Sequence, residues 1–248
     1  MSWGSRFLEG RVVLVVGVGS GMGRSIALSL GARGARLGLV SRSRGRLESV
    51  CREALEAGAG ACEYAVGDAT VEESLEGAFR VLRERLGRVW GLVYNAGGFF
   101  GTEGFEEVSD EFWRGALELN VVGAWRAVRL LSGDLRDERG AVVAVGASPW
   151  TALAGNVAYA SSKGALFYLV KRLAKELAGE GVRVNCVAPG PTSHSPAPLE
   201  APGGDVVLRE PRVESPWDVG EAVAFLLSPA ARRVTGECLS LDGGMSLP

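Results

Sequence analysis

Short apolar runs alternate with helical patterns along the chain, and this alternation limits the fold more than any other feature of the sequence. Five runs are almost continuously apolar, as in strands buried on both faces of a sheet; they span 12–17, 37–40, 88–95, 141–146 and 182–189. Weaker runs at 61–66 and 237–242 bring the predicted strands to seven. Helical spacing predicts helices at 22–32, 44–57, 71–86, 109–132, 158–179 and 217–228.

Strands that alternate with helices need right-handed crossovers, which place helices on both faces of a parallel sheet. We therefore expect an α/β fold with a doubly wound, mostly parallel seven-stranded sheet. No linker or repeat interrupts the 248 residues, of which 47% are hydrophobic, so we expect one domain over 1–248. Ligands of such sheets bind at the carboxyl ends of the strands.

The charge balance and the hydropathy argue against two classes of partner. A formal net charge of −2 gives no electrostatic reason to bind nucleic acid or an anionic membrane surface. No apolar run approaches the roughly 18 to 20 residues of a membrane span, and the opening MSWGSRFLEG lacks the apolar core of a secretory signal. We expect a cytoplasmic protein whose partners are small molecules.

The metal-binding residue types are scattered along the sequence. Cys51, Cys62, Cys186 and Cys238 form no C-x-x-C pair and have no His nearby, so we expect reduced thiols and no metal site. His194 is the only histidine, and its position in a Pro-rich segment is typical of an ordinary loop residue.

A glycine-rich turn, GVGSGMG, joins the first predicted strand to the first predicted helix. Such a turn can bring backbone amides and the positive end of a helix dipole up to a pyrophosphate, although a tight turn also favours glycine for its own sake. Its position after the first strand favours dinucleotide binding. The candidate cofactor-binding residues are Gly17, Gly19, Gly21, Met22 and Gly23.

The end of the second strand should meet the adenosine ribose, and the sequence there is SRSR at 41–44. An acidic residue at this point accepts hydrogen bonds from a free 2′-hydroxyl, whereas arginine accommodates a 2′-phosphate. Ser41 and Arg42 therefore favour NADP, with NAD as the less favoured alternative.

A tyrosine and a lysine occupy positions 159 and 163 in the segment YASSK, at the start of a long predicted helix. Four residues apart, they share one helix face. A tyrosine titrates near pH ~10, and a neighbouring cation stabilises its phenolate. In isolation such a pair is typical of an ordinary amphipathic helix.

The pair is not isolated. GVGSGMG, GDAT, YNAG, LNVVG, YASSK, NCVAPG and LDGG follow one another in the order of the short-chain dehydrogenase/reductase family. The chain resembles this family over nearly its whole length, and within it the single-domain 3-oxoacyl-(acyl carrier protein) reductases. The resemblance implies a Rossmann fold, a nicotinamide cofactor and hydride transfer between that cofactor and a carbonyl or secondary alcohol.

The resemblance also implies roles for individual residues. Tyr159 would give or take the proton on the substrate oxygen, Lys163 would lower the tyrosine pKa and hold the nicotinamide ribose, and Asn120 would anchor a water. Further cofactor contacts would come from Asp68 at the adenine, from Asn95, Ala96 and Gly97 beside the cofactor, and from Pro189 and Gly190. Thr192 would bind the nicotinamide carboxamide, a role that Ser193 or His194 could fill instead.

The sequence departs from the family where the fifth predicted strand ends. Family members carry a substrate-binding serine about thirteen residues before the tyrosine, and that position is Gly146 here. Alignment by strand instead puts Ala147 in the serine's place, with Ser148 next to it. Ser148 is the candidate for the role, which it could fill only after a backbone shift.

Three functions remain open at this point: an NADP-dependent carbonyl or 3-oxoacyl reductase, an NAD-dependent alcohol dehydrogenase, and a nucleotide-binding regulatory or partner protein with impaired turnover. The region 190–212 would be the substrate loop, and its prolines and glycines favour an irregular structure. Phe99 and Trp150 follow strand ends and give a weak preference for an apolar carbonyl substrate. The resemblance further implies a homo-oligomer, a dimer or a tetramer.

Overall fold

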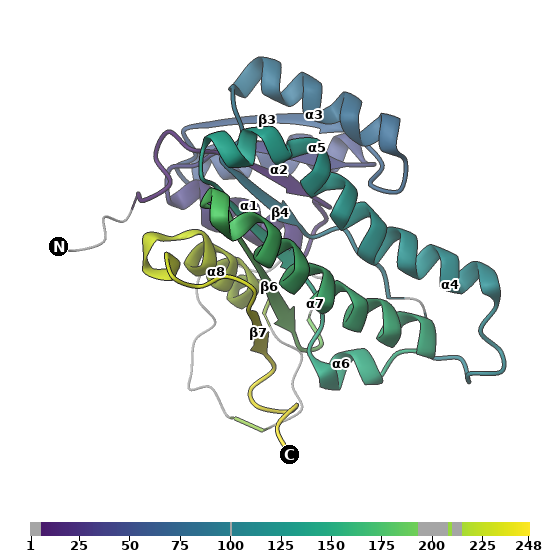
Figure 1. Ribbon diagram of the computed structural model, residues 1–248. Helices are drawn as coiled ribbons and strands as arrows, with labels where there is room; N and C mark the ends of the chain where they lie inside the picture. The colour runs from purple at the N-terminus through teal and green to yellow at the C-terminus, as the bar shows by residue number, and fades with distance from the viewer. Residues whose placement is uncertain (1–5, 100, 193–207, 210–214) are drawn as a thin grey trace.

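A computed structural model describes residues 6–99, 101–192, 208–209 and 215–248 (Figure 1). Its strands form one sheet of seven in the order β3-β2-β1-β4-β5-β6-β7, and every neighbouring pair is parallel. The predicted doubly wound sheet is therefore confirmed. The strands are β1 (Val12–Val16), β2 (Arg36–Ser41), β3 (Ala61–Val66), β4 (Gly91–Tyr94), β5 (Ala141–Val145), β6 (Arg183–Pro189) and β7 (Cys238–Leu241).

Helices cover both faces of this sheet, with α1, α2 and α8 on one face and α3, α5 and α7 on the other (Figure 1). None of the helices in the described ranges is both long and apolar enough to cross a bilayer. The helices are α1 (Met22–Ala32), α2 (Arg44–Glu56), α3 (Glu72–Leu86), α4 (Asp110–Leu117), α5 (Gly123–Asp137), α6 (Pro149–Leu153), α7 (Val157–Leu177) and α8 (Pro216–Leu227), with short turns η1 (Glu118–Val122), η2 (Ala178–Glu180) and η3 (Pro229–Ala231).

Strand β1 shows why the central runs of the sequence are continuously apolar. Successive side chains of a strand point to opposite faces. Val13 and Val15 enter the core under α1 and α8, whereas Val12 and Leu14 enter the core under α3 and α5. All of them are buried, so both faces of the sheet demand apolar residues.

One predicted helix is divided in the structure. The periodicity predicts a single helix over 109–132, but α4 and α5 are separated by the π-helical turn η1, which contains Asn120. The short helix α6 was not predicted, because five residues are too few for a helical period to show.

The expectation of reduced thiols is wrong for one cysteine pair. Cys51 in α2 and Cys62 in β3 form a disulfide, with their Cα atoms 5.5 Å apart. The return of the chain from α2 to the neighbouring strand brings them together, and no local motif signals this tertiary contact. Cys186 and Cys238 are free and lie opposite each other on β6 and β7.

A buried carboxylate ties α5 to the turn that leads into β4. One oxygen of Asp134 accepts a hydrogen bond from the Arg83 guanidinium at 2.8 Å, and the other accepts one from the Val89 backbone amide at 3.0 Å. Removal of this carboxylate leaves the Val89 amide buried without a partner.

We therefore expect Asp134→Ala to lower the free energy of unfolding by about 2 to 3 kcal/mol. Asp137→Ala is the matched control, because Asp137 is more than half exposed and pairs with Arg88 at 3.2 Å on the surface. Its loss should stay below about 1 kcal/mol. Urea unfolding of both variants checks the difference, and equal losses would contradict it.

Candidate active site

A cavity of about 520 Å³ opens where β1, β2, β3 and β4 end. Its lining brings together eleven of the residues that the sequence assigned to a cofactor: Gly17, Gly19, Gly21, Met22, Gly23, Ser41, Arg42, Asp68, Asn95, Ala96 and Gly97. Carboxyl ends of parallel strands meet at one edge of a sheet, which explains why segments far apart in sequence converge here.

The glycine turn leaves a cradle that a side chain would fill. Gly17 has φ +94°, and a Cβ there would collide with the backbone of Asn95 and Ala96. A Cβ at Gly23 would lie 2.6 Å from the Gly17 carbonyl oxygen. The turn is fixed by the Asn95 side-chain amide, which donates to the same Gly17 oxygen at 2.6 Å.

Asn95 also carries an unsatisfied acceptor. Its Oδ1 is buried and has no hydrogen-bond partner within the described part of the chain. A buried acceptor of this kind is costly unless a donor reaches it, and the adjoining cavity is the place for one. The cradle and this acceptor fit a polar dinucleotide.

The part of the cavity beyond β2 and β3 combines one carboxylate with arginines. Asp68 accepts hydrogen bonds from the Thr70 amide at 2.9 Å and the Thr70 hydroxyl at 2.7 Å. The Thr70 hydrogen bonds, and to a lesser degree the charge of Arg42, hold the pKa of Asp68 below its ordinary value. Arg46 also lines the cavity. The sequence analysis missed it, although its place one helical turn beyond Arg42 was a usable signal.

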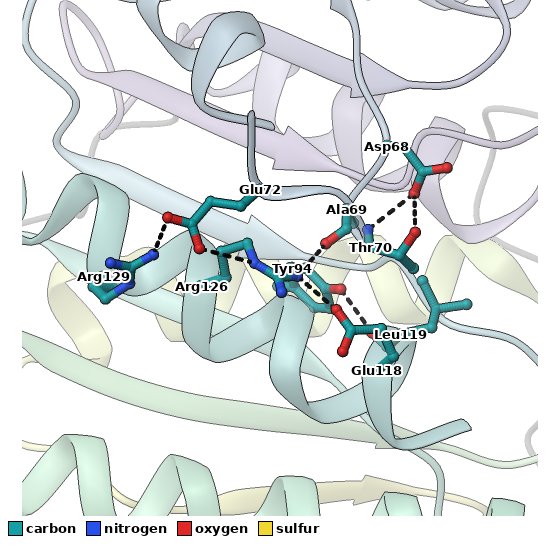
Figure 2. Close-up of polar contacts among 9 residues, drawn as sticks. All are labelled: Asp68, Ala69, Thr70, Glu72, Tyr94, Glu118, Leu119, Arg126 and Arg129. Carbon is teal, nitrogen blue, oxygen red and sulfur yellow. Dashed lines mark hydrogen bonds and ion pairs between the residues drawn. The ribbon is translucent and has the colours of Figure 1, made fainter. Parts of the chain in front are cut away.

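Figure 2 shows how the loop that carries Asp68 is held. The Arg126 guanidinium in α5 donates to the Ala69 carbonyl at 3.0 Å. The same side chain lies 2.9 Å from the Glu118 carboxylate and 3.5 Å from that of Glu72. These contacts fasten the loop that carries Asp68 to α5 and to η1, the turn that contains Asn120.

Side-chain hydrogen bonds also hold the π-helical turn η1 in place. Tyr94, at the end of β4, donates its hydroxyl to the Leu119 carbonyl at 2.7 Å (Figure 2). Asn120 is fully buried; its amide donates to the Ser162 hydroxyl at 2.9 Å and its oxygen accepts from the Gly98 amide at 3.2 Å. A π turn shifts the helix register locally, and this shift aims Asn120 inward.

Tyr159 and Lys163 lie in the first turns of α7, which Asn156 caps by accepting from the Tyr159 amide at 2.9 Å. The Lys163 ammonium is 5.8 Å from the centre of the Tyr159 ring and donates to the Val145 carbonyl at 3.4 Å. Only 6% of Tyr159 and 5% of Lys163 is exposed. Gly97 adjoins them: a Cβ there would lie 3.2 Å from the Lys163 nitrogen.

Burial sets the protonation of both groups. It raises the pKa of Tyr159 to about 12, and it lowers the pKa of Lys163 to about 8. The sequence analysis expected the lysine to lower the tyrosine pKa, and the structure gives the opposite direction because desolvation dominates. Tyr159 is therefore protonated at neutral pH and can donate that proton.

Comparison with known proteins identifies the architecture around these residues. Residues 17–246 match the family model described as enoyl-(acyl carrier protein) reductase. The chain is 32% identical to the 3-oxoacyl-(acyl carrier protein) reductase of Vibrio cholerae, over 96% of this chain and 98% of that one. The chain belongs to the short-chain dehydrogenase/reductase family.

Two further relatives show the breadth of the match. The chain is 34% identical to the inactive 2-(S)-hydroxypropyl-CoM dehydrogenase 2 of Xanthobacter autotrophicus, over 86% of this chain and 96% of that one. The solved structure of levodione reductase superposes with a TM-score of 0.85 at 26% identity, covering 96% of this chain and 98% of the other.

Against this short-chain dehydrogenase/reductase background, Ser148 has an unusual environment. Its hydroxyl accepts from the Thr151 amide at 3.3 Å and donates to the Thr151 hydroxyl at 3.2 Å, so it caps α6. Ala147 and Ala152 pack against Tyr159 instead. A role for Ser148 at the substrate oxygen stays a prediction.

The remaining predicted residues lie after β6. Gly190 donates its amide to the Leu241 carbonyl at 2.7 Å, and the Thr192 hydroxyl donates to the Gly190 carbonyl at 3.0 Å. Pro189, Gly190 and Thr192 are not among the described residues that line the cavity. Of the proposed substrate loop at 190–212, residues 193–207 and 210–212 lie outside the described residues, as does His194.

Within the described ranges, no cluster of three or more His, Cys, Asp or Glu side chains could hold a metal ion.

The lowered pKa of Lys163 makes a signed prediction about stability. A lysine that titrates near 8 when folded and near 10.5 when unfolded destabilises the fold fully below pH 8, by about 3 kcal/mol, and not at all above pH 10.5. Lys163→Met should therefore unfold at higher urea than the parent at pH 7, and the gain should vanish as pH rises from about 8 to 10.5.

Lys175→Met is the matched control, since Lys175 is exposed on the same helix. Its free energy of unfolding should follow the parent's at every pH. A Lys163→Met difference that does not change between pH 7 and pH 10 would contradict the assignment of a depressed pKa to Lys163.

Proposed function

We propose that the chain is an NADP(H)-dependent oxidoreductase that reduces a carbonyl compound to an alcohol, with Tyr159 as the proton donor. The observation that carries the proposal is the buried pair of Tyr159 and Lys163 next to a cavity. Gly97 lines this cavity and adjoins Lys163, and Arg42 and Arg46 line the same cavity. NADP carries its 2′-phosphate at one end and its nicotinamide at the other, so the arginines would meet the phosphate and the Tyr159–Lys163 pair the nicotinamide.

The chemistry divides between the cofactor and the chain. Bound reduced nicotinamide supplies a hydride, which adds to the carbonyl carbon. Tyr159 donates its proton to the oxygen as that atom gains charge, which is general acid catalysis. Lys163 titrates close enough to neutrality to return a proton to the phenolate. Asn120 anchors a water at its side chain, and this water links Lys163 to solvent.

The protonation of Tyr159 favours the reductive direction. A pKa of about 12 means that the free site carries the phenol and not the phenolate at neutral pH. Alcohol oxidation would first require removal of this proton, which burial opposes.

Ser41, Arg42 and Arg46 support NADP over NAD. All three line the cavity beyond β2, where a 2′-phosphate would lie. Guanidinium groups recognise phosphate through paired hydrogen bonds and charge. The nearest acidic residue in the lining is Asp68, which belongs to the adenine side.

We also infer a homo-oligomer, a dimer or a tetramer. Phe112, Trp125 and Tyr168 are at least 38% exposed. They belong to α4, α5 and α7, which lie on the same side of the sheet (Figure 1). Large apolar side chains gathered on neighbouring helices support burial by a second copy. The cytoplasmic location expected from the sequence stays a prediction.

A second candidate function is nucleotide binding with impaired turnover. One observation favours it: the Ser148 hydroxyl is engaged in the cap of α6, and alanines pack on Tyr159. A relative whose printed name describes it as inactive gives this candidate further weight.

Tyr159→Phe tests the enzymatic proposal. Loss of the proton donor should lower kcat by at least about 10²-fold in NADPH-dependent reduction of ketones, 3-oxoacyl thioesters and quinones. Tyr168→Phe is the control, because Tyr168 lies on the same helix and is 79% exposed. A parent protein with no rate above that of Tyr159→Phe would favour the non-catalytic candidate.

Arg42→Ala tests the cofactor proposal by equilibrium titration. The NADPH dissociation constant should rise about 10- to 100-fold, as expected for a lost charged hydrogen bond, while that of NADH changes little. Arg52→Ala, an exposed arginine of α2, should leave both unchanged. Tighter binding of NADH than of NADPH by the parent would reverse the assignment.

A further inference from the structure

Apart from Lys163, the side chains recorded beside the Tyr159 ring in the described part of the chain are apolar, although the proposed reaction places a charged oxygen at this tyrosine. Ala147 and Ala152 form a small buried cluster with Tyr159. Phe99 meets the same ring edge-on, with centroids 5.1 Å apart and planes at 66°. Neither the two methyl groups nor the phenyl ring can donate a hydrogen bond.

The hydroxyl of Ser148, the residue after Ala147, is occupied by hydrogen bonds within α6. Ser148 is fully buried, and both of its side-chain hydrogen bonds go to Thr151. Its backbone is also fixed, because the Ser148 amide donates to the Pro189 carbonyl at 2.8 Å. A turn of this hydroxyl toward Tyr159 would uncap α6, and a shift of the backbone would break the bond to β6.

The missing donor has a chemical consequence. When a carbonyl carbon accepts a hydride, its oxygen develops negative charge, and each well-placed donor there is worth roughly 10²- to 10³-fold in kcat. The Tyr159 hydroxyl makes no hydrogen bond to another described residue, so it is available to the substrate. Tyr159 therefore supplies one hydrogen-bond donor to the substrate oxygen, whereas reduction of a simple ketone would be faster with two.

We propose that this site is matched to activated carbonyls, and specifically to vicinal diketones with an apolar body. The proposal rests on the reductase function proposed above and names its substrate class. A second carbonyl next to the first withdraws electrons and stabilises the developing alkoxide, so the substrate itself replaces the missing donor. Phe99, which is 57% exposed and contacts the Tyr159 ring, offers apolar surface to the rest of the molecule.

The reaction balances with the proposed cofactor. The two electrons of the hydride form the new C–H bond, and the carbonyl π pair moves to oxygen, which takes the proton of Tyr159. The second carbonyl is unchanged, so the product is an α-hydroxyketone. Tyr159 regains its proton from solvent by way of Lys163.

The experiment compares two substrates that differ by one carbonyl, phenylpropanedione and propiophenone, in the parent and in Ala147→Ser. The serine would place a hydroxyl beside Tyr159. We expect the parent to reduce the diketone far faster, and Ala147→Ser to raise kcat/KM for propiophenone by about 10²-fold but for the diketone by less than about threefold. Ala154→Ser, exposed at the end of α6, is the control for adding a hydroxyl and should leave the ratio unchanged.

Ser148→Ala separates capping from catalysis. Loss of the cap should lower the urea midpoint while the diketone-to-ketone ratio stays at the parent value. A drop of about 10²-fold in kcat for both substrates would assign the substrate oxygen to Ser148 and overturn the proposal.

Two other outcomes would also overturn it: a parent that reduces propiophenone as well as the diketone, or an Ala147→Ser variant that accelerates both equally. In each case the reductase function stands, because activity is present and Tyr159→Phe still removes it. A parent that reduces neither compound nor any carbonyl of the wider panel removes the reductase function, and the substrate class with it.

Discussion

The close approach of two turns, after β1 and after β4, is the constraint on which the rest of the site depends. Gly17 lies so near the backbone of Asn95 and Ala96 that no side chain fits between them, and the Asn95 amide locks the contact with its bond to the Gly17 carbonyl. This approach opens the cradle on one side. On the other side it sets Gly97 against Lys163 and Asn120, so the proposed cofactor pocket and the proposed proton-transfer groups meet at one backbone segment.

Desolvation, more than the charge of the lysine, governs the chemistry available at this segment. The same burial that raises the pKa of Tyr159 lowers the pKa of Lys163. The pair is therefore a protonated phenol beside an ammonium that loses its proton more easily than usual. Such a pair donates protons more readily than it accepts them. Because the buried neighbours of Tyr159 include two alanines, we propose that the substrate itself compensates for the absent second donor.

Much of this arrangement could be predicted from the sequence, because it depends on backbone geometry. The apolar strands, the glycine turn and the residues after β2, β3 and β4 follow from periodicity and from the rule that parallel strands end together. The structure confirms the predicted seven-stranded sheet, and the family model confirms the predicted family. The convergence of eleven predicted residues on one cavity follows from the same geometry.

The parts that could not be predicted depend on side-chain partners distant in sequence. Nothing in the pattern over 109–132 marks the π turn, which is held by the Tyr94 hydroxyl on the Leu119 carbonyl. The disulfide between Cys51 and Cys62 is likewise a tertiary event. The cap that the Ser148 hydroxyl forms on α6 is a local feature, but α6 is too short for its helical period to show in the sequence.

The central claim is that one cavity holds NADP from Arg42 to Gly97 and presents a carbonyl to Tyr159. A crystal structure with NADP⁺ and an α-hydroxyketone bound tests it most directly. We predict the 2′-phosphate at Arg42 and Arg46, the nicotinamide beside Lys163, and the hydroxyl oxygen of the ligand on the Tyr159 hydroxyl with the Ala147 methyl next to it. A dinucleotide bound elsewhere, or a ligand oxygen held by Ser148 instead of Tyr159, would contradict the account.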